Sequence, residues 1–225
     1  MTKASITLLT LKFLEGAHRL EWSTQGLGML RTYLSKEVRL HIWHSRFRVP
    51  HVSSIHDHPW DFESEVLCGR IRNTRYGIVH MTDHGAVLRD GAGQSLGAVA
   101  NPGAPNFTMQ TIRCGTGGGI ERACELGEPG PCHLSMLSNA EYSPGDSYHQ
   151  NAPDIHDTSA EDGTVTIVTR TFRADSEHAR VFFPTGTDWV SAEPRAATPE
   201  EVHLGLKSAA TLLSWTLSHH DRPGT

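Results

Sequence analysis

The sequence predicts a mainly β protein, built as one barrel domain with a helix at each end. Between residues 38 and 185, short runs of β-branched and apolar residues alternate with Gly, Pro, Asn and Asp, which is typical of strands joined by turns. Helical periodicity occurs only near the termini, so strands do not alternate with helices as they do in a parallel sheet. A chain of 225 residues fits a single domain, residues 1–225, without disulfides or structural zinc.

The N-terminal segment predicts a short amphipathic helix. It is apolar in part, but Lys12 and Glu15 interrupt it and no small-residue cleavage site follows. We therefore do not interpret it as a signal peptide. No stretch of the chain approaches the roughly 18 apolar residues that a membrane-spanning helix needs.

The C-terminal segment carries a complete helix-start signal. Thr198 is a capping residue, Pro199 stands at the first helical position, and Glu201 lies three residues after the cap. Apolar residues then recur at helical spacing, so we expect a helix over residues 199–218 that covers one side of the barrel. The apolar stripe consists of Val202, Leu206, Ala209, Leu213 and Leu217.

Between the ends, three segments predict strands of the barrel core, which we place at about residues 38–185. Residues 38–44 alternate between polar and apolar, and residues 65–78 and 164–172 are rich in β-branched or apolar side chains. Residues 90–132 contain many Gly and Pro, and we expect a loop-rich insertion there. Short strands around residues 107–112 and 120–124 would make this insertion a hairpin between the two halves of the barrel.

The composition indicates which kinds of binding partner and which cellular compartment to expect. The formal net charge is −5, which does not resemble the basic footprint of a protein that binds nucleic acid or an anionic membrane. The four cysteines contain no C-x-x-C pair and are simplest as free thiols in a reducing cytoplasm. The histidine count of 15 is unusual, and several histidines fall in short segments.

The pair His56 and His58 gives the sharpest functional signal. Side chains two residues apart on a strand point to the same face, so both imidazoles can bind one metal ion. Imidazole suits iron, nickel, zinc or copper. The alternative is that both are ordinary polar residues of a loop.

A second segment supplies a third histidine. Pro144 and Gly145 form a turn that enters a strand, and His149 and His156 follow before the strand at residues 164–172. The His-x-His pair before Gly69 and the later Pro-Gly-to-His segment together resemble the two motifs of the cupin superfamily. This resemblance covers about residues 38–175. It implies a double-stranded β-helix, or jelly-roll, with a metal at its centre.

The resemblance leaves two candidates for the third metal ligand. His156 has the better spacing to the following strand, and its surroundings are similar to the second motif of cysteine-dioxygenase-type cupins. We therefore expect His56, His58 and His156 to bind the metal. His149, which lies nearer to Pro144-Gly145, is expected to support a ligand or to contact the substrate.

The sequence departs from the common cupin pattern at one position. Most cupins have a glutamate ligand seven residues before the glycine of the first motif, and Phe62 occupies that position here. Glu63 faces outward in a regular strand, although a bulge would reverse this. The set of three histidines without a carboxylate resembles the iron site of thiol dioxygenases. Glu63 or Asp61 remains an alternative fourth ligand.

The resemblance implies an Fe(II) dioxygenase that acts on a small polar metabolite, such as a thiol or an amino acid, together with O₂. Tyr148, His149 and Arg173 are the candidate catalytic residues: a phenol for an oxygen intermediate, a supporting imidazole and a guanidinium for the substrate carboxylate. No sequence argument chooses Arg173 securely over the other arginines of predicted strands. These are Arg46, Arg48, Arg70, Arg72 and Arg170.

Two other classes of function stay open. One is a non-redox isomerase, lyase or hydrolase that uses Zn, Mn or Ni as a Lewis acid. The other is a cupin that binds a ligand without turnover. In each case we expect a cytoplasmic protein that binds neither nucleic acid nor membrane, and a homodimer is compatible with the sequence.

Overall fold

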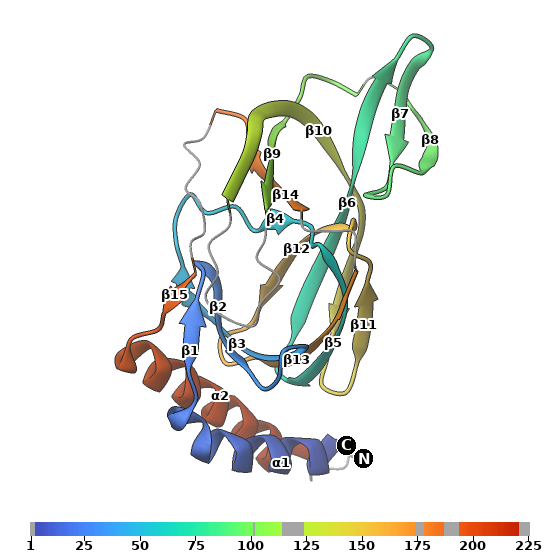
Figure 1. Ribbon diagram of the computed structural model, residues 1–225. Helices are drawn as coiled ribbons and strands as arrows, with labels where there is room; N and C mark the ends of the chain where they lie inside the picture. The colour runs from blue at the N-terminus through green and yellow to red at the C-terminus, as the bar shows by residue number, and fades with distance from the viewer. Residues whose placement is uncertain (1–2, 101, 114–123, 174–177, 187–193, 221–225) are drawn as a thin grey trace.

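Two antiparallel β-sheets make up most of the protein (Figure 1). Residues of both sheets line one pocket. The computed structural model describes residues 3–100, 102–113, 124–173, 178–186 and 194–220. The predicted mainly β barrel with a helix at each end is confirmed. In the described part of the chain, no helix is long and apolar enough to cross a membrane.

The first sheet has seven strands and lies next to the helices. Its order is β11-β5-β13-β3-β2-β1-β15, and each neighbouring pair is antiparallel. The strands are β11 Ser147–Gln150, β5 Trp60–Cys68, β13 Val165–Phe172, β3 Val38–Arg48, β2 Leu27–Tyr33, β1 Trp22–Thr24 and β15 Arg195–Ala196.

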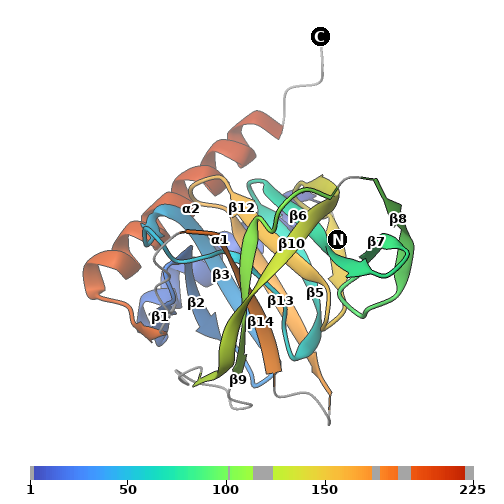
Figure 2. The ribbon, with the colours of Figure 1, turned by 90° about the horizontal axis from the view of Figure 1, so that it is seen from above.

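The second sheet has eight strands in the order β10-β9-β14-β4-β12-β6-β7-β8. Because β10 also pairs with β6, the first six of these strands close into a barrel, while the hairpin of β7 and β8 projects to one side (Figure 2). The strands are β10 Cys124–Tyr142, β9 Phe107–Arg113, β14 His178–Pro184, β4 Ile55–His56, β12 Ile155–Ala160, β6 Ile71–Thr82, β7 Gly85–Arg89 and β8 Ser95–Val99.

Apolar side chains form three stacked layers. The innermost layer of the closed barrel contains Ile55, Ile155 and Phe182. A second layer, between the closed barrel and the seven-stranded sheet, contains Trp60 and Phe62. The third lies between the seven-stranded sheet and the helices. Alternation along each strand therefore sends neighbouring residues into different layers.

The two long helices cover the outer face of the seven-stranded sheet (Figure 1). They are α1 Lys3–Gly16, which the short helix η1 Ala17–Arg19 follows, and α2 Pro199–His220. Helix α2 begins with the expected capping box, because Thr198 N donates to Glu201 Oε2 at 2.9 Å and Glu201 N donates to Thr198 Oγ1 at 3.3 Å. Its predicted apolar stripe packs on the sheet through Ala209 and Leu213.

The expected strands are present, with different lengths. Residues 65–78, which were expected to be strand-forming, belong to β5 and β6, which a turn at Gly69 joins. The strands β1 and β2, before residue 38, were not expected, because residues 22–33 mix polar and apolar residues without a clear period.

The described part of residues 90–132 contains more strand than a loop-rich insertion would. It contains β8, β9 and the start of β10, and β9 pairs with both β10 and β14. The predicted strand at 107–112 corresponds to β9, and most of the one predicted at 120–124 lies outside the described residues. Ladder hydrogen bonds override the weak strand propensity of the Gly- and Pro-rich sequence here.

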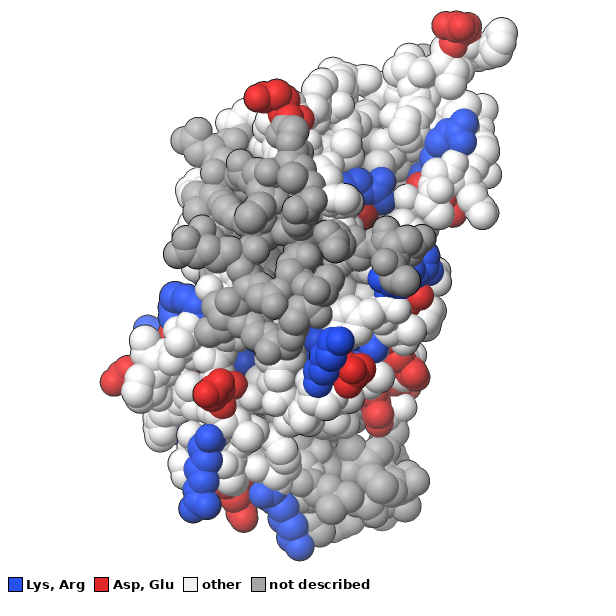
Figure 3. Space-filling view, viewed as in Figure 1, with Lys and Arg blue, Asp and Glu red and all other residues white. Residues whose placement is uncertain are grey.

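Charged side chains are mixed on the face that Figure 3 shows. Lys and Arg of the described residues are interspersed with Asp and Glu and do not gather in one patch of a single sign. Several of them form exposed pairs across neighbouring strands or loops, such as Arg70 with Glu161 at 3.0 Å.

We expect Gly69→Ala to destabilise the fold more than Gly93→Ala. Both glycines have a positive φ, 75° and 85°, but a Cβ at Gly69 would overlap Thr164 Oγ1 and lie 2.9 Å from Thr164 Cα, whereas at Gly93 it would meet nothing within 4 Å. Gly93→Ala therefore measures the backbone strain alone. We expect Gly69→Ala to lower the free energy of unfolding by about 1–3 kcal/mol more, measured by urea denaturation. Equal losses would contradict this steric account.

Candidate metal centre

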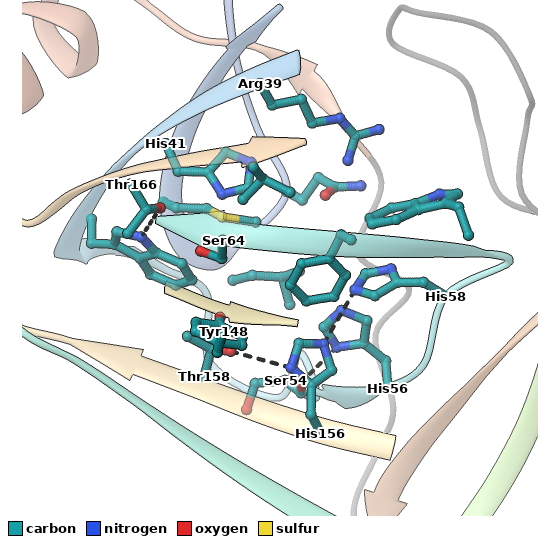
Figure 4. A pocket seen from close by; sticks show the side chains of 17 residues that line it. Arg39, His41, Ser54, His56, His58, Ser64, Tyr148, His156, Thr158 and Thr166 are labelled. Atoms are coloured by element: carbon teal, nitrogen blue, oxygen red, sulfur yellow. Dashed lines mark hydrogen bonds between the residues drawn. The ribbon is translucent and has the colours of Figure 1, made fainter. Parts of the chain in front are cut away.

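Three histidines from distant parts of the chain meet between the two sheets. His56 on β4 pairs in register with His156 on β12, and His58 follows two residues later. Ile55 and Ile155 point into the closed barrel, so His56 and His156, the next residue on each strand, point the opposite way, into the pocket (Figure 4). The cluster therefore lies between the closed barrel and the seven-stranded sheet, and not inside the closed ring of strands.

The distances within this cluster fit a metal centre. The Nε2 atoms of His58 and His156 are 3.2 Å apart, and the candidate ligand atoms of all three residues lie within 4.8 Å of one another. Two nitrogens bound to one ion at about 2.1 Å are about 3.0 to 3.4 Å apart. The cluster could thus bind a metal ion.

A chain of hydrogen bonds fixes which nitrogen of His156 faces the pocket. The carbonyl of Asp154 can only accept, so Gln150 Nε2 donates to it at 3.0 Å and Gln150 Oε1 is left as an acceptor. Asn73 Nδ2 donates to that oxygen at 3.1 Å, which leaves Asn73 Oδ1 to accept from His156 Nδ1 at 2.9 Å. With its proton on Nδ1, His156 presents the lone pair of Nε2 to the pocket.

His56 is oriented in the same way by the backbone. Its Nδ1 lies 2.7 Å from the carbonyl oxygen of Ser54, which can only accept. The proton of the neutral ring is therefore on Nδ1, and Nε2 carries the lone pair. Such outer hydrogen bonds set the tautomer and raise the basicity of metal-binding histidines.

Burial keeps the three imidazoles neutral. It lowers the pKa of His56, and it is the main reason why the pKa values of His58 and His156 lie well below the usual 6.5. The neighbouring histidines lower the latter two further, and Arg39 and Arg170 also lower the pKa of His58. Neutral imidazole is the form that binds a metal.

A buried ion pair holds the segment between the two first-motif histidines. Asp57 accepts from Arg180 Nε at 2.6 Å and from the Arg180 backbone N at 2.5 Å. Arg180 Nη2 also donates to the carbonyls of Gly91 and Pro153. Burial raises the pKa of Asp57 to about 6 despite this pairing. One arginine of β14 therefore connects the His56–His58 segment to the turn that precedes His156.

No carboxylate joins the cluster among the described residues. Phe62 faces the pocket, with its ring centroid 5.4 Å from that of His58 and 5.7 Å from that of His156. Glu63 is exposed on the opposite face of β5, so no bulge brings it back. Asp61 binds Arg173 at 2.8 Å and accepts from the backbone N of Ala152. The alternative of a fourth ligand from Glu63 or Asp61 is therefore wrong in this structure.

The pocket beside the histidines is small and mostly apolar, with a volume of about 80 Å³. Tyr148 is buried in its wall, and burial raises the pKa of this phenol to about 12, so that it keeps its proton. The ring of Trp60 stacks on that of His58 with centroids 4.0 Å apart. The apolar and aromatic lining residues are Leu27, Met29, Trp43, Trp60, Phe62, Tyr148 and Val168.

The structure separates the other predicted site residues from the pocket. His149 follows Tyr148 on β11, is exposed and lies opposite Glu63, so it neither binds with the cluster nor supports it. Arg173 pairs with Asp61 at an exposed position and does not line the pocket. Arg46, Arg48, Arg70 and Arg72 are also exposed and do not line the pocket. Arg170 is buried and packs on Trp60.

Sequence reasoning missed four residues around the cluster. Asn73 and Gln150 orient His156, and Arg39 and His41 line the pocket. The signal for the latter two was available, because alternation along residues 38–44 places Arg39, His41 and Trp43 on one face. Nothing in the sequence indicated Asn73 or Gln150, since β6, β11 and β12, which carry Asn73, Gln150 and His156, come together only in the folded structure.

Comparison of the chain with protein-family models and with curated protein sequences finds no match. The chemistry of the site therefore has to be argued from its own residues.

We expect Asn73→Ala to weaken metal binding by about 10- to 100-fold, because His156 loses the acceptor that fixes its tautomer. Asn139→Ala is the matched control, since Asn139 is exposed on the neighbouring strand β10. Competition between the protein and a chelator for Co(II) measures the affinity. If both variants bind Co(II) as tightly as the wild type, the hydrogen-bond chain does not matter for ligation.

Metal affinity should also depend on pH in an unusual way. Because the folded-state pKa values of all three histidines lie below 6.5, protons compete with the ion only below that pH. We expect an affinity for Zn(II) that is constant from about pH 8 down to 6.5 and falls at lower pH. Isothermal titration in buffers of equal ionic strength tests this. A steady fall between pH 8 and 7 would mean that the imidazoles are not desolvated as described.

Proposed function

We propose that the protein is a cupin-type, Fe(II)-dependent oxygenase that acts on a small polar metabolite together with O₂. One observation carries this proposal: three neutral imidazoles converge on a pocket that no described carboxylate lines. His56, His58 and His156 are the proposed ligands. The resemblance of their motifs to those of cysteine-dioxygenase-type cupins supports the same assignment.

The donor set suits such a metal. Imidazole nitrogens bind divalent iron well, and three of them leave coordination positions open towards the pocket. Bound Fe(II) would supply adjoining positions for substrate and O₂, so that their encounter becomes effectively intramolecular. The other groups that act in the site are side chains of the protein itself.

The pocket walls can exclude water and hold one proton in place. Trp60 and Phe62 cover two sides of the histidine cluster with aromatic carbon. A dry site restricts the escape of oxidising species into solvent. Tyr148 is part of the pocket wall, and we propose that its hydroxyl, which burial keeps protonated, donates a hydrogen bond to a bound oxygen atom.

The second candidate is a Lewis-acid enzyme with Zn, Mn or Ni, since three histidines are also a catalytic zinc set. Such enzymes usually need a general base close to the metal. Among the residues that line the pocket, no Asp or Glu is available, and burial holds the pKa of His41 well below its usual value. The lack of a general base among the pocket-lining residues favours the oxygenase. A cupin that binds a ligand without turnover is the third candidate.

We expect the Fe(II)-loaded protein to consume O₂ in the presence of a small thiol or amino acid, without 2-oxoglutarate. His56→Ala, His58→Ala and His156→Ala should each lose both stoichiometric iron and O₂ uptake while they retain the circular dichroism spectrum of the fold. Iron content is measured by plasma mass spectrometry and O₂ by an electrode. His149→Ala is the matched control, and it should keep both properties because its side chain is exposed.

The same assay separates the metals. Activity that is lost on chelation and restored by Fe(II), but not by Zn(II), supports the oxygenase. Full turnover of a substrate with Zn(II) in the absence of O₂ would replace it with the Lewis-acid candidate. Iron retained by all three histidine variants would reject the ligand assignment itself.

A further inference from the structure

The pocket has a second polar end, away from the three imidazoles. Arg39 and His41 come from β3, two residues apart, so their side chains share one face of the strand. Figure 4 shows both on the far side of the pocket from His56 and His156. Gln25 lines the pocket as well.

Arg39 belongs to a cluster of three guanidinium groups. The Cζ atoms of Arg31, Arg39 and Arg170 lie 5.8, 4.8 and 5.4 Å from the ring centroid of Tyr33. Arg31 and Arg170 are buried, with exposed fractions of 5% and 3%. Three cations thus gather around one aromatic ring next to the pocket.

The charge of Arg39 is not neutralised by the described residues. Neither Arg31 nor Arg39 has a carboxylate within 4.0 Å in the described part of the chain, and Arg39 Nε is buried without a hydrogen-bond acceptor. Burial, together with the charges of Arg31 and Arg170, lowers the pKa of Arg39 to about 9. It is therefore still protonated at neutral pH. A buried guanidinium without a counter-charge is costly, so this arrangement favours an anion from outside.

Two arginines elsewhere in the protein do have buried acidic partners. Arg75 binds Asp154 at 2.8 Å, and Arg180 binds Asp57 at 2.6 Å. The Nε2 atom of His41, beside Arg39, is also buried without a partner. Two unsatisfied nitrogen groups therefore border the same end of the pocket.

We propose that Arg39, with His41 beside it and Arg31 behind it, binds an oxyanion group of the substrate. Arg39 is a substrate-binding residue in this scheme, and Arg31 is a positioning residue that is itself held by Gln25 Oε1 at 2.7 Å and by Ser23 Oγ at 3.1 Å. That the anion is a substrate rests on the proposed function, whereas the binding of the anion does not require the metal.

The cluster also selects the kind of anion. An ammonium group on the same small molecule would lie close to Arg39 and Arg31, and like charges a few ångströms apart repel strongly in a buried site. The substrate class is therefore a small organic acid with net negative charge, and a zwitterionic amino acid is disfavoured. The pocket, with a volume of about 80 Å³, favours a small molecule.

Titration of the metal-free protein tests this proposal. Butanoate and β-alanine have the same shape and differ in one charge, and inorganic phosphate represents the tetrahedral oxyanions. We expect butanoate to bind at least about tenfold more tightly than β-alanine, measured by isothermal titration and by the shifts of the arginine Nε–H signals in NMR spectra. If phosphate binds at least about tenfold more tightly than butanoate, the recognised group is of the phosphate type.

Arg39→Met keeps most of the side-chain volume and removes the charge. Arg39→Met should weaken binding of the preferred anion by about tenfold or more, and Arg39→Lys should keep part of the affinity. Arg72→Met, at an exposed position, should leave the affinity unchanged. The preferred anion should also raise the unfolding temperature of the wild type and not that of Arg39→Met.

Equal affinity of wild type and Arg39→Met, or absence of binding by any of the three compounds, would overturn the proposal. Equal affinity for butanoate and β-alanine would overturn the charge selectivity. If Arg39→Met does not fold, Arg39→Lys takes its place in the test. A fork-shaped contact would be excluded if Arg39→Lys bound all three compounds as tightly as the wild type and if none of them shifted the arginine Nε–H signals of the wild type. Because no metal is present, failure here is independent of whether Fe(II) binds or O₂ is consumed.

Discussion

The contact between His58 Nε2 and His156 Nε2 is the feature on which the arrangement of the pocket depends. The hydrogen bonds from Asp154 through Gln150 and Asn73 leave His156 with a lone pair on that nitrogen, and burial keeps both rings neutral. Two such nitrogens at 3.2 Å need a proton or a cation between them. Much of the surrounding polar structure, including the Asp57–Arg180 pair, holds this approach in place.

The layered packing of the protein makes such a polar site tolerable. The closed barrel and the helix-covered face of the seven-stranded sheet each have their own apolar layer, on either side of the layer that contains the pocket. The polar groups are thus confined to the interface between two separately packed bodies. Residues on alternate positions of β3 show this division, because Leu40 and Ile42 pack towards the helices while Arg39 and His41 face the pocket.

Local chemistry decided which parts of the structure could be predicted from the sequence. The capping box of α2 and the proximity of His56 to His58 follow from interactions within a few residues of the chain. The outward position of Glu63 follows from strand alternation alone. The pairing of β9 with β14 and the hydrogen bonds of Asn73 depend on partners far away in the sequence, and no local pattern indicates them.

The histidine cluster has one more consequence, which comes from the distances along the chain. His58 and His156 are separated by 98 positions, and they meet only after β12 has paired with β4 and β6. An unfolded chain keeps only the local pair His56 and His58, so a bound ion prefers the native state and adds its binding energy to the stability of the fold. Closure of this long loop is also a slow, entropically costly step of folding. Metal supply would thereby act on the lifetime of the folded protein in the cell, in addition to its chemistry.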